Sequence, residues 1–331
     1  MREYGKVICE TDKKSGQNRR LVFAADLGGT HLRAATIDEL GRVHFHVKQK
    51  TPAAQSADQI VGELVRAARD GERQGALEGC SIHAICVAVP GSVNVSAGRV
   101  VKAPNLPCLD GFDLAEKLTK ELKRKSILEN DANAAAVGEM WQGAARNCRT
   151  IICVTLGTGV GGGIVLGGEL WHGVNDSAAE IGHMCVEPFA GVVCGCGSRG
   201  CLEVYASGTA IVRMTREARP RYPKSVLQSE PLTAKRIYCA AVKGDQLALE
   251  VFRRMGAYLG IGLSNLINVL SPEMIVIAGG VVNAWELFVK DMNQQIAERS
   301  FPVAAAELKI VRGECGDDAG LLGAAKLALA I

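Results

Sequence analysis

The chain has 331 residues, a length that favours two domains over one or three. Hydrophobic residues make up 48% and charged residues 22% of it, so general disorder and a fibrous repeat are excluded. With 38 basic and 35 acidic residues, the formal charge of +3 does not indicate a nucleic-acid or membrane surface, and a small-molecule partner is expected. Residues 1–20 form a polar leader that lacks the apolar middle of a secretory signal. Because no apolar run reaches about 18 residues, we predict no membrane span and a cytoplasmic protein.

The first half of the chain alternates strands with helices. Three strands are predicted first, at residues 21–25, 32–37 and 42–50, and they form an antiparallel start. Ser56 and Gln59 make a capping box that opens an amphipathic helix through Ile60 and Leu64. The half closes with a continuous apolar strand at 82–89, a helix near 113–123 and a strand at 126–128.

The second half continues the same alternation. The predicted elements are a helix at 132–142, strands at 151–155 and 163–166, a helix at 255–270, a strand at 274–278 and a helix at 317–331. The strand, Gly/Thr turn and strand at 151–166 repeat the plan of 21–37 after roughly 130 residues, which indicates a duplicated half. Residues 216–232 are interpreted as a surface loop. Mixed sheets flanked by helices, the α/β class, follow from this order.

Three glycine-containing turns follow predicted strands, at 26–30, 156–163 and 279–280. Glycine lets backbone N–H groups approach phosphate oxygens, and Thr30 and Thr158 add hydroxyl donors, although each turn alone is equally an ordinary tight turn. Residues 157–162 match the G-x-G-x-x-G pattern, but a strand follows instead of a helix, so dinucleotide binding of the Rossmann type is disfavoured. The chain contains no P-loop sequence.

A cluster of cysteines indicates a metal site. Cys194, Cys196 and Cys201 stand in a glycine-rich loop, and three thiolates need a fourth ligand for tetrahedral Zn²⁺. His183 is the first candidate and Cys185 the rival. Because four protein ligands leave no position for water, the zinc would be structural. Three unrelated buried thiols are the alternative.

Several polar residues carry two interpretations. Asp131 lies between a strand and a helix, where it is either a helix N-cap or a general base that accepts a proton from a substrate hydroxyl. Glu180 and Glu203 flank the metal loop and suit vicinal hydroxyls, or they are surface charges. Asn105 is either a turn residue or a ligand.

Taken together, five motifs resemble the ROK family of sugar kinases and repressors, with the greatest likeness to its ATP-dependent glucokinases. They are Asp26-Leu27-Gly28-Gly29-Thr30, Glu129-Asn130-Asp131-Ala132-Asn133, Leu156-Gly157-Thr158-Gly159-Val160-Gly161, Glu180-Ile181-Gly182-His183 and residues 194–203. The resemblance implies an actin-like, ribonuclease H-like duplicated ATPase fold with ATP and sugar in a cleft. Its small lobe would span 21–131, joined by the helix at 317–331, and its large lobe 132–316, with the zinc loop at 183–203.

The resemblance also implies roles for residues. Asp131 would be the catalytic base for the 6-hydroxyl of glucose, and Asp26 would orient Mg²⁺. The sugar ligands would be Gly91, Asn105, Asn130, Glu180, His183 and Glu203. The ATP phosphates would meet Asp26, Gly28, Gly29, Thr30, Gly157, Thr158, Gly159 and Gly280. His183 would serve both zinc and sugar, and a homodimer is implied.

Other functions compete with this one. Kinases for N-acetylmannosamine, N-acetylglucosamine, fructose or allose differ in pocket volume, and Ser92 departs from the proline common in glucokinases. A sugar-sensing regulator would keep the zinc and sugar sites but not Asp131. The 20-residue leader is too short for the helix-turn-helix of repressor members, and a zinc-ribbon nucleic-acid module would need separated ligand pairs and a basic surface.

Overall fold

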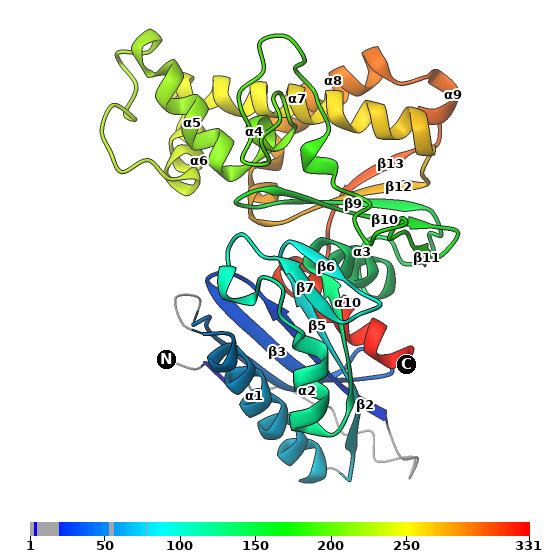
Figure 1. Ribbon diagram of the computed structural model, residues 1–331. Helices are drawn as coiled ribbons and strands as arrows, with labels where there is room; N and C mark the ends of the chain where they lie inside the picture. The colour runs from blue at the N-terminus through cyan, green and yellow to red at the C-terminus, as the bar shows by residue number, and fades with distance from the viewer. Residues whose placement is uncertain (1–2, 5–19, 53–55, 78) are drawn as a thin grey trace. The chain divides into compact units, whose positions relative to one another are not determined.

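The computed structural model describes residues 3–4, 20–52, 56–77 and 79–331, which form two units (Figure 1). Unit 1 consists of residues 1–147, 163–178 and 314–331, and unit 2 of residues 148–162 and 179–313. Most of the predicted polar leader lies outside the described residues. Within the described ranges, no helix has the length and apolar character needed to cross a bilayer.

Unit 1 is built on a six-stranded sheet with the order β1-β4-β3-β2-β5-β8. Its strands are β1 (Glu3–Tyr4), β2 (Arg20–Leu27), β3 (His31–Asp38), β4 (Val43–Lys50), β5 (Ser81–Val89) and β8 (Lys125–Asn130). The pairs β2–β3 and β3–β4 are antiparallel, as predicted, whereas β2–β5 and β5–β8 are parallel. β1 pairs with β4, so two leader residues extend the sheet. A separate hairpin joins β6 (Ser92–Asn94) to β7 (Arg99–Lys102).

Helices cover both faces of this sheet (Figure 1). They are α1 (Ala57–Leu77), α2 (Leu114–Leu122), α3 (Asp131–Trp141) and α10 (Ala319–Leu329), with 3-10 turns η1 (Pro107–Leu109) and η5 (Gly316–Asp318). Ile60 of α1 and Leu114 of α2 join the core on one face, and Ala134 of α3 and Leu321 of α10 join the core on the other. Because both faces are covered, β5 is apolar along most of its length, as the sequence predicts.

Helix α3 belongs to unit 1, although the predicted lobe boundary at residue 131 would place it in the second lobe. It packs backbone to backbone on α10, because a Cβ at Gly138 would overlap the carbonyl oxygen of Ala319 and one at Gly323 that of Ala134. The buried carboxylate of Glu139 accepts hydrogen bonds from the backbone N–H groups of Glu314 (3.0 Å) and Cys315 (2.9 Å). The end of α3 is therefore fixed to the segment that precedes α10.

The second sheet has the order β11-β10-β9-β12-β13. Its strands are β9 (Ile151–Leu156), β10 (Val160–Leu166), β11 (Glu169–Leu170), β12 (Met274–Ala278) and β13 (Lys309–Arg312). β12 is parallel to both β9 and β13. The chain forms a strand directly after the turn at 157–159, as predicted, so the G-x-G-x-x-G match opens no helix.

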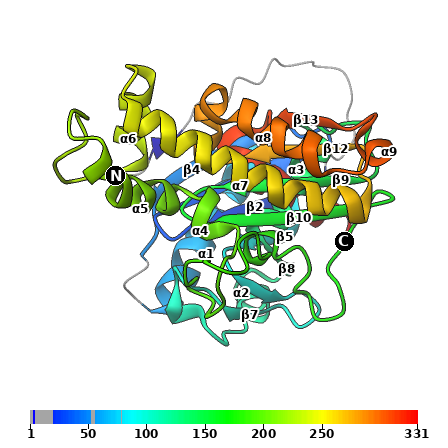
Figure 2. The ribbon, with the colours of Figure 1, turned by 90° about the horizontal axis from the view of Figure 1, so that it is seen from above.

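The remaining helices belong to unit 2. They are α4 (Glu203–Ala206), α5 (Gly208–Ala218), α6 (Ala234–Val242), α7 (Gln246–Leu270), α8 (Trp285–Arg299) and α9 (Pro302–Ala305), with 3-10 turns η2 (Ile181–His183), η3 (Arg219–Arg221) and η4 (Gly280–Ala284). Helices α7 and α8 lie side by side in both views (Figures 1 and 2). α7 begins earlier than predicted, because the side chain of Asp245 caps it by accepting a hydrogen bond from Ala248 N.

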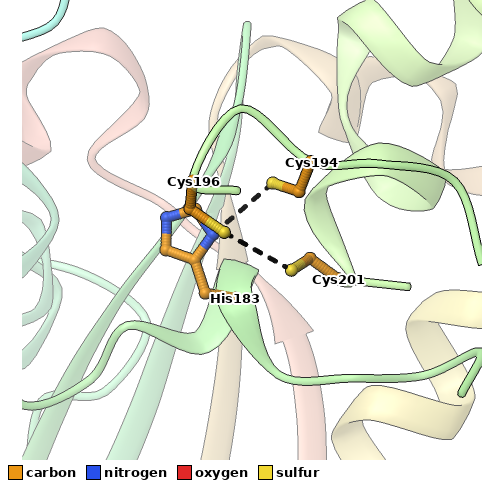
Figure 3. A group of neighbouring side chains, drawn as sticks. All are labelled: His183, Cys194, Cys196 and Cys201. Atoms are coloured by element: carbon orange, nitrogen blue, oxygen red, sulfur yellow. Dashed lines mark hydrogen bonds between the residues drawn. The ribbon is translucent and has the colours of Figure 1, made fainter. Parts of the chain in front are cut away.

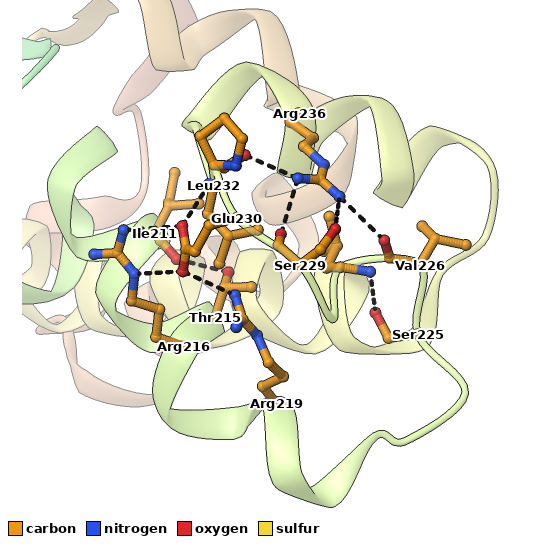
Figure 4. Close-up of polar contacts among 12 residues, drawn as sticks. Ile211, Thr215, Arg216, Arg219, Ser225, Val226, Ser229, Glu230, Leu232 and Arg236 are labelled. Atoms are coloured by element: carbon orange, nitrogen blue, oxygen red, sulfur yellow. Dashed lines mark hydrogen bonds and ion pairs between the residues drawn. The ribbon is translucent and has the colours of Figure 1, made fainter.

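The predicted surface loop at 216–232 starts later, since α5 and η3 continue to Arg221. Its conformation is held by ionic contacts, shown in Figure 4. Glu230 accepts hydrogen bonds from Arg216 and from Arg219, and this lowers the pKa of its carboxyl to about 2. Arg236 donates to the backbone oxygens of Ser229 and Pro231, at 2.9 Å each. Arginine contacts therefore determine the shape of a segment without regular structure.

Candidate functional site

Several candidate residues of unit 1 gather at one edge of its sheet. β2, β5 and β8 are parallel, with Asp26 paired to Ala88 and Val89 paired to Asn130 in the register. The carboxyl ends of the three strands therefore meet, which is where open α/β sheets place their ligands.

The junction of β8 and α3 carries the predicted base. Asn130 is the N-cap: its Oδ1 accepts hydrogen bonds from Ala132 N (2.9 Å) and Asn133 N (3.0 Å). The alternative that Asp131 is the N-cap is therefore wrong, because the extended residue before the helix is Asn130. Asp131 is the first helical residue, where the helix dipole favours a negative charge. Its Oδ1 accepts a hydrogen bond from Ala132 N at 2.8 Å.

Gly91 is joined to this junction. Asn130 Nδ2 donates a hydrogen bond to the carbonyl oxygen of Gly91 at 2.9 Å. Gly91 has φ 96°, and a Cβ there would overlap the carbonyl oxygen of Lys102. Only glycine fits this position, so the bond between Asn130 and Gly91 has a fixed geometry.

The turn at 28–30 contacts Asn105. Gly28 N donates to His31 O (2.9 Å), and Thr51 Oγ1 donates to Gly28 O (2.6 Å). A Cβ on Gly29 would lie 2.8 Å from Asn105 Cβ, so the turn and Asn105 are immediate neighbours. Asn105 and Thr30 are exposed and accessible to a ligand.

Asp26 lies near the end of β2, between buried neighbours and beside a cation. Arg33 Nη1 lies 3.2 Å from its carboxylate, and Arg33 Nη2 lies 2.9 Å from Asp317. Burial raises the pKa of Asp26, and the charge of Arg33 opposes that shift. The carboxylate nearest to the turn at 28–30 is therefore already paired with an arginine.

In unit 2, the other two glycine turns also share a sheet edge. Ala278 is paired to Thr155 in the parallel register of β12 and β9, so the turns at 157–159 and 279–280 follow neighbouring strand ends. Gly279 has φ 89° and packs against the Leu156 backbone. Gly208 N donates to Gly157 O (2.8 Å), which anchors the first turn to α5.

The turn at 157–159 has a second contact with α5. Thr209 Oγ1 donates to Thr158 O at 2.8 Å. Thr158 and Gly280 are exposed, and Gly280 begins the turn η4. Both positions thus follow directly on strands of one sheet, as the sequence predicts.

Three cysteines and one histidine converge in unit 2 (Figure 3). One ligand atom from each of His183, Cys194, Cys196 and Cys201 lies within 4.8 Å of all the others. His183 Nδ1 is 3.8 Å from Cys194 Sγ, and Cys196 Sγ is 3.7 Å from Cys201 Sγ. Ligand atoms around tetrahedral zinc are about 3.3 to 3.8 Å apart, so this donor set fits the ion. Cys185, the rival fourth ligand, is not in the group.

The thiols of this group differ in acidity. A backbone hydrogen bond from Ser198 lowers the pKa of Cys196 to about 7, whereas burial raises that of Cys201 to about 12. The exposed thiol is therefore the readier thiolate, the form in which cysteine binds metals.

Both predicted glutamates of unit 2 contact the residues of this loop. Glu203 Oε2 accepts a hydrogen bond from Val160 N (3.0 Å), directly after Gly159, and its Oε1 is 3.9 Å from Cys194 Sγ. Glu180 Oε2 is 3.9 Å from His183 Nε2, on the imidazole nitrogen that faces away from Cys194. His183 thus presents one nitrogen to the thiols and the other to a carboxylate.

Sequence reasoning missed one pair of residues in unit 1. His172 Nε2 lies 2.8 Å from Glu129 Oε2, directly before the Asn130-Asp131 segment. The two positions are 43 residues apart, and His172 follows the two-residue strand β11 in a segment without periodicity. The only available signal was the acidic residue beside Asn130.

Comparisons with known proteins cover the part of the chain that contains these motifs. The model of the ROK family matches residues 22–331. The chain belongs to the ROK family. A glucokinase from Halalkalibacterium halodurans is 37% identical over 311 residues, covering 92% of this chain and 93% of the relative. A crystal structure of a ROK family glucokinase from Streptomyces griseus in complex with glucose and AMPPNP has a TM-score of 0.80 and 34% identity, covering 94% of this chain and all of that one.

The chain is also similar to a transcriptional regulator. A xylose repressor from Caldicellulosiruptor bescii is 27% identical over 322 residues, covering 96% of this chain and 79% of the repressor. The fold expected from the sequence, with mixed sheets and an actin-like ATPase architecture, is confirmed by the structures of ROK sugar kinases. The family thus contains both catalysts and regulators.

Proposed function

We propose that this chain is a sugar kinase that transfers the γ-phosphoryl group of ATP to the 6-hydroxyl of glucose. The observation that carries the proposal is the position of Asp131, a carboxylate at the start of α3 on the edge where β2, β5 and β8 end. As general base, Asp131 accepts the hydroxyl proton while that oxygen attacks phosphorus. The similarity to a glucokinase over 92% of the chain supports glucose as the substrate.

The remaining residues have proposed binding roles. The turns at 28–30 and 157–159, together with Gly280, hold phosphate oxygens through backbone N–H groups, and Asp26 supports Mg²⁺. Burial raises the pKa of Asp26, and the ion pair with Arg33 opposes this shift and so favours the ionised carboxylate. The sugar hydroxyls meet the following side chains and the backbone near Gly91: Asn105, Asn130, Glu180, His183 and Glu203. Carboxylates and amides suit vicinal hydroxyls because each accepts or donates two hydrogen bonds.

We further propose that His183, Cys194, Cys196 and Cys201 hold a structural zinc ion. Four protein ligands close the coordination shell, so the metal shapes the loop and does not activate water. The 3.9 Å separation of His183 Nε2 and Glu180 supports a coupling of the metal to sugar binding through one imidazole. We also propose that the protein is a homodimer, which light scattering can test. A cytoplasmic location is consistent with the use of ATP.

A substrate panel tests this function. Purified zinc-replete protein is assayed with Mg-ATP and, in parallel, glucose, fructose, mannose, allose, N-acetylglucosamine, N-acetylmannosamine and xylose, by measuring ADP and the sugar phosphate. We expect turnover with glucose at the highest kcat/KM. If an acetamido sugar is preferred, the proposed substrate changes from glucose to that sugar, while the proposed reaction remains ATP-dependent phosphorylation of a sugar.

A sugar-sensing regulator is the second candidate, supported by the similarity to a xylose repressor. Such a protein binds a sugar without turnover. Calorimetric sugar binding in the absence of any sugar-dependent ADP formation would overturn the kinase proposal and favour the regulator. The carboxylate at position 131 favours the kinase.

A further inference from the structure

Glu129 is a buried carboxylate next to the proposed catalytic segment. Its side chain is 3% exposed, whereas His172, its partner at 2.8 Å, is 27% exposed. A carboxylate removed from water needs a cation or several donors to remain ionised. The histidine supplies one donor, and Asn130 and Asn133 supply the others.

The second oxygen of Glu129 contacts residues on both sides of Asp131, namely the backbone of Asn130 and the side chain of Asn133. Glu129 Oε1 accepts hydrogen bonds from Asn130 N (2.9 Å) and from Asn133 Nδ2 (3.0 Å). Asn130 in turn caps α3 and donates to Gly91 O. A rotation of the Glu129 carboxylate would therefore disturb the start of α3, where Asp131 lies.

The segment that carries His172 is anchored to unit 1 by its own contacts. Trp171 N donates to Ile164 O (2.8 Å), and Ala178 N donates to the backbone oxygen of His172 (3.0 Å). Asp176 Oδ2 accepts a hydrogen bond from Val95 N (3.0 Å) in the loop between β6 and β7. The imidazole is thus presented to Glu129 by a fixed backbone.

The charges around this pair favour a protonated histidine. The hydrogen bond to Glu129 raises the pKa of His172 above 6.5, burial opposes the shift, and the charges of Glu129 and Asp176 add to it. The thiol of Cys86 on β5, whose pKa is raised by burial and then by the Glu129 charge, stays neutral. Protonation of His172 is therefore favoured where its imidazole faces Glu129.

We propose that His172 is a positioning residue, which in its protonated form holds the Glu129 carboxylate and through it orients Asp131 for proton transfer. This inference rests on the proposed function of Asp131. His172 acts through Glu129, and no contact between the imidazole and the substrate is required.

The test compares three variants with the wild type in glucose- and ATP-dependent turnover between pH 5.5 and 9.5. His172→Gln keeps a neutral donor, His172→Arg keeps a permanent cation, and His83→Gln removes an exposed histidine of β5 as the matched control. We expect kcat of His172→Gln to fall about tenfold at pH 6.5, with KM for ATP unchanged, because misplacement of a catalytic group lowers the rate of the chemical step.

The pH profile separates positioning from a merely structural role. Wild-type kcat should decrease as pH rises through the raised pKa of His172, and the His172→Gln deficit should disappear at pH 9.5. His172→Arg should restore the activity and abolish this alkaline decrease, and His83→Gln should match the wild type. The acidic limb that belongs to Asp131 should persist in every variant.

A readout independent of activity completes the test. The ¹⁵N resonance of the Asn130 amide, which donates to Glu129, should follow the titration of His172 in the wild type and not in His172→Gln. Wild-type protein that phosphorylates no sugar would overturn the proposed function, whatever the amide does. If the wild type is active and His172→Gln has the same kcat and pH profile, the proposed role of His172 is overturned. The same follows if the Asn130 amide resonance does not change with the titration of His172.

Discussion

The β8–α3 junction in unit 1 and the cysteine loop in unit 2 position their functional side chains by different physical means. At the junction, backbone N–H groups on both sides of Asp131 donate hydrogen bonds to Glu129 Oε1 and Asn130 Oδ1. In the loop, one ligand atom from each of the three cysteines and His183 lies within 4.8 Å of the others, with two pairs at 3.7 and 3.8 Å. Thiols at this spacing do not attract one another strongly, so we expect the proposed zinc ion to hold the four ligands together.

This difference predicts which substitutions should disturb each region. The junction derives its order from hydrogen bonds within the protein, so loss of the Asp131 carboxylate itself should leave α3 in place. In the loop, the proposed zinc would add to backbone hydrogen bonds such as that from Cys194 N to Ser198 O (2.8 Å), and loss of a single ligand should release the metal. Substitutions in the two regions should therefore separate catalysis from structure.

The largest expected effect is that of Asp131→Asn. The amide cannot accept the hydroxyl proton as a base, so kcat for glucose should fall about 10³-fold. Because Asn130 and not residue 131 caps α3, thermal stability and glucose binding should stay close to those of the wild type. Steady-state kinetics, differential scanning calorimetry and glucose titration measure the three quantities. Retention of more than a tenth of wild-type kcat would remove Asp131 from the role of base.

A smaller but broader effect is expected from Cys196→Ser. Loss of one thiolate ligand should reduce bound zinc well below one ion per chain and raise KM for glucose about 10- to 100-fold, because His183 loses its anchor. Elemental analysis and kinetics check this result, and a chelator should reproduce it in the wild type.

Cys185→Ser is the matched control for the metal loop, since Cys185 is exposed like Cys196 but lies outside the four-residue group. It should retain zinc and activity. If Cys185→Ser loses the metal while His183→Gln keeps it, Cys185 is the fourth ligand and the assignment of His183 is wrong.

The smallest expected effect is on stability, from a substitution at Ala179, which precedes the metal loop. Ala179 has φ 63°, a conformation that disfavours a side chain, directly before Glu180. Ala179→Gly should stabilise the protein by about 0.5 to 1 kcal/mol, as relief of strain exceeds the added entropy of the unfolded chain. Chemical denaturation measures the change.

Ala178→Gly is the neighbouring control. Ala178 is not among the residues with positive φ, so the added flexibility should destabilise by about 0.4 to 1 kcal/mol. Equal signs for the two substitutions would show that the backbone at 179 carries no strain.

Local patterns in the sequence predicted the long strands of the first sheet and the main motifs, but gave no ranges for the β6–β7 hairpin or for α5, α6 and α8. The apolar run at 82–89 became β5, and the antiparallel order of the first three long strands followed from their alternation. Of the two roles left open for Asp131, the N-cap is wrong, because Asn130 and Asp131 are both good caps and only the extended backbone of Asn130 distinguishes them. The Glu129–His172 pair was missed because a contact between distant segments leaves no periodicity.

The packing of α10 on α3 has a consequence for synthesis of the protein. Unit 1 takes its residues from three stretches, the last of which is 314–331, and the glycine contacts at Gly138 and Gly323 admit no looser fit. During translation, unit 1 therefore stays incomplete until α10 has been synthesised after all of unit 2. Until then, the alanine-rich face of α3 that contacts α10 is uncovered. A nascent chain stalled before residue 314 should be a good client for chaperones and a poor enzyme.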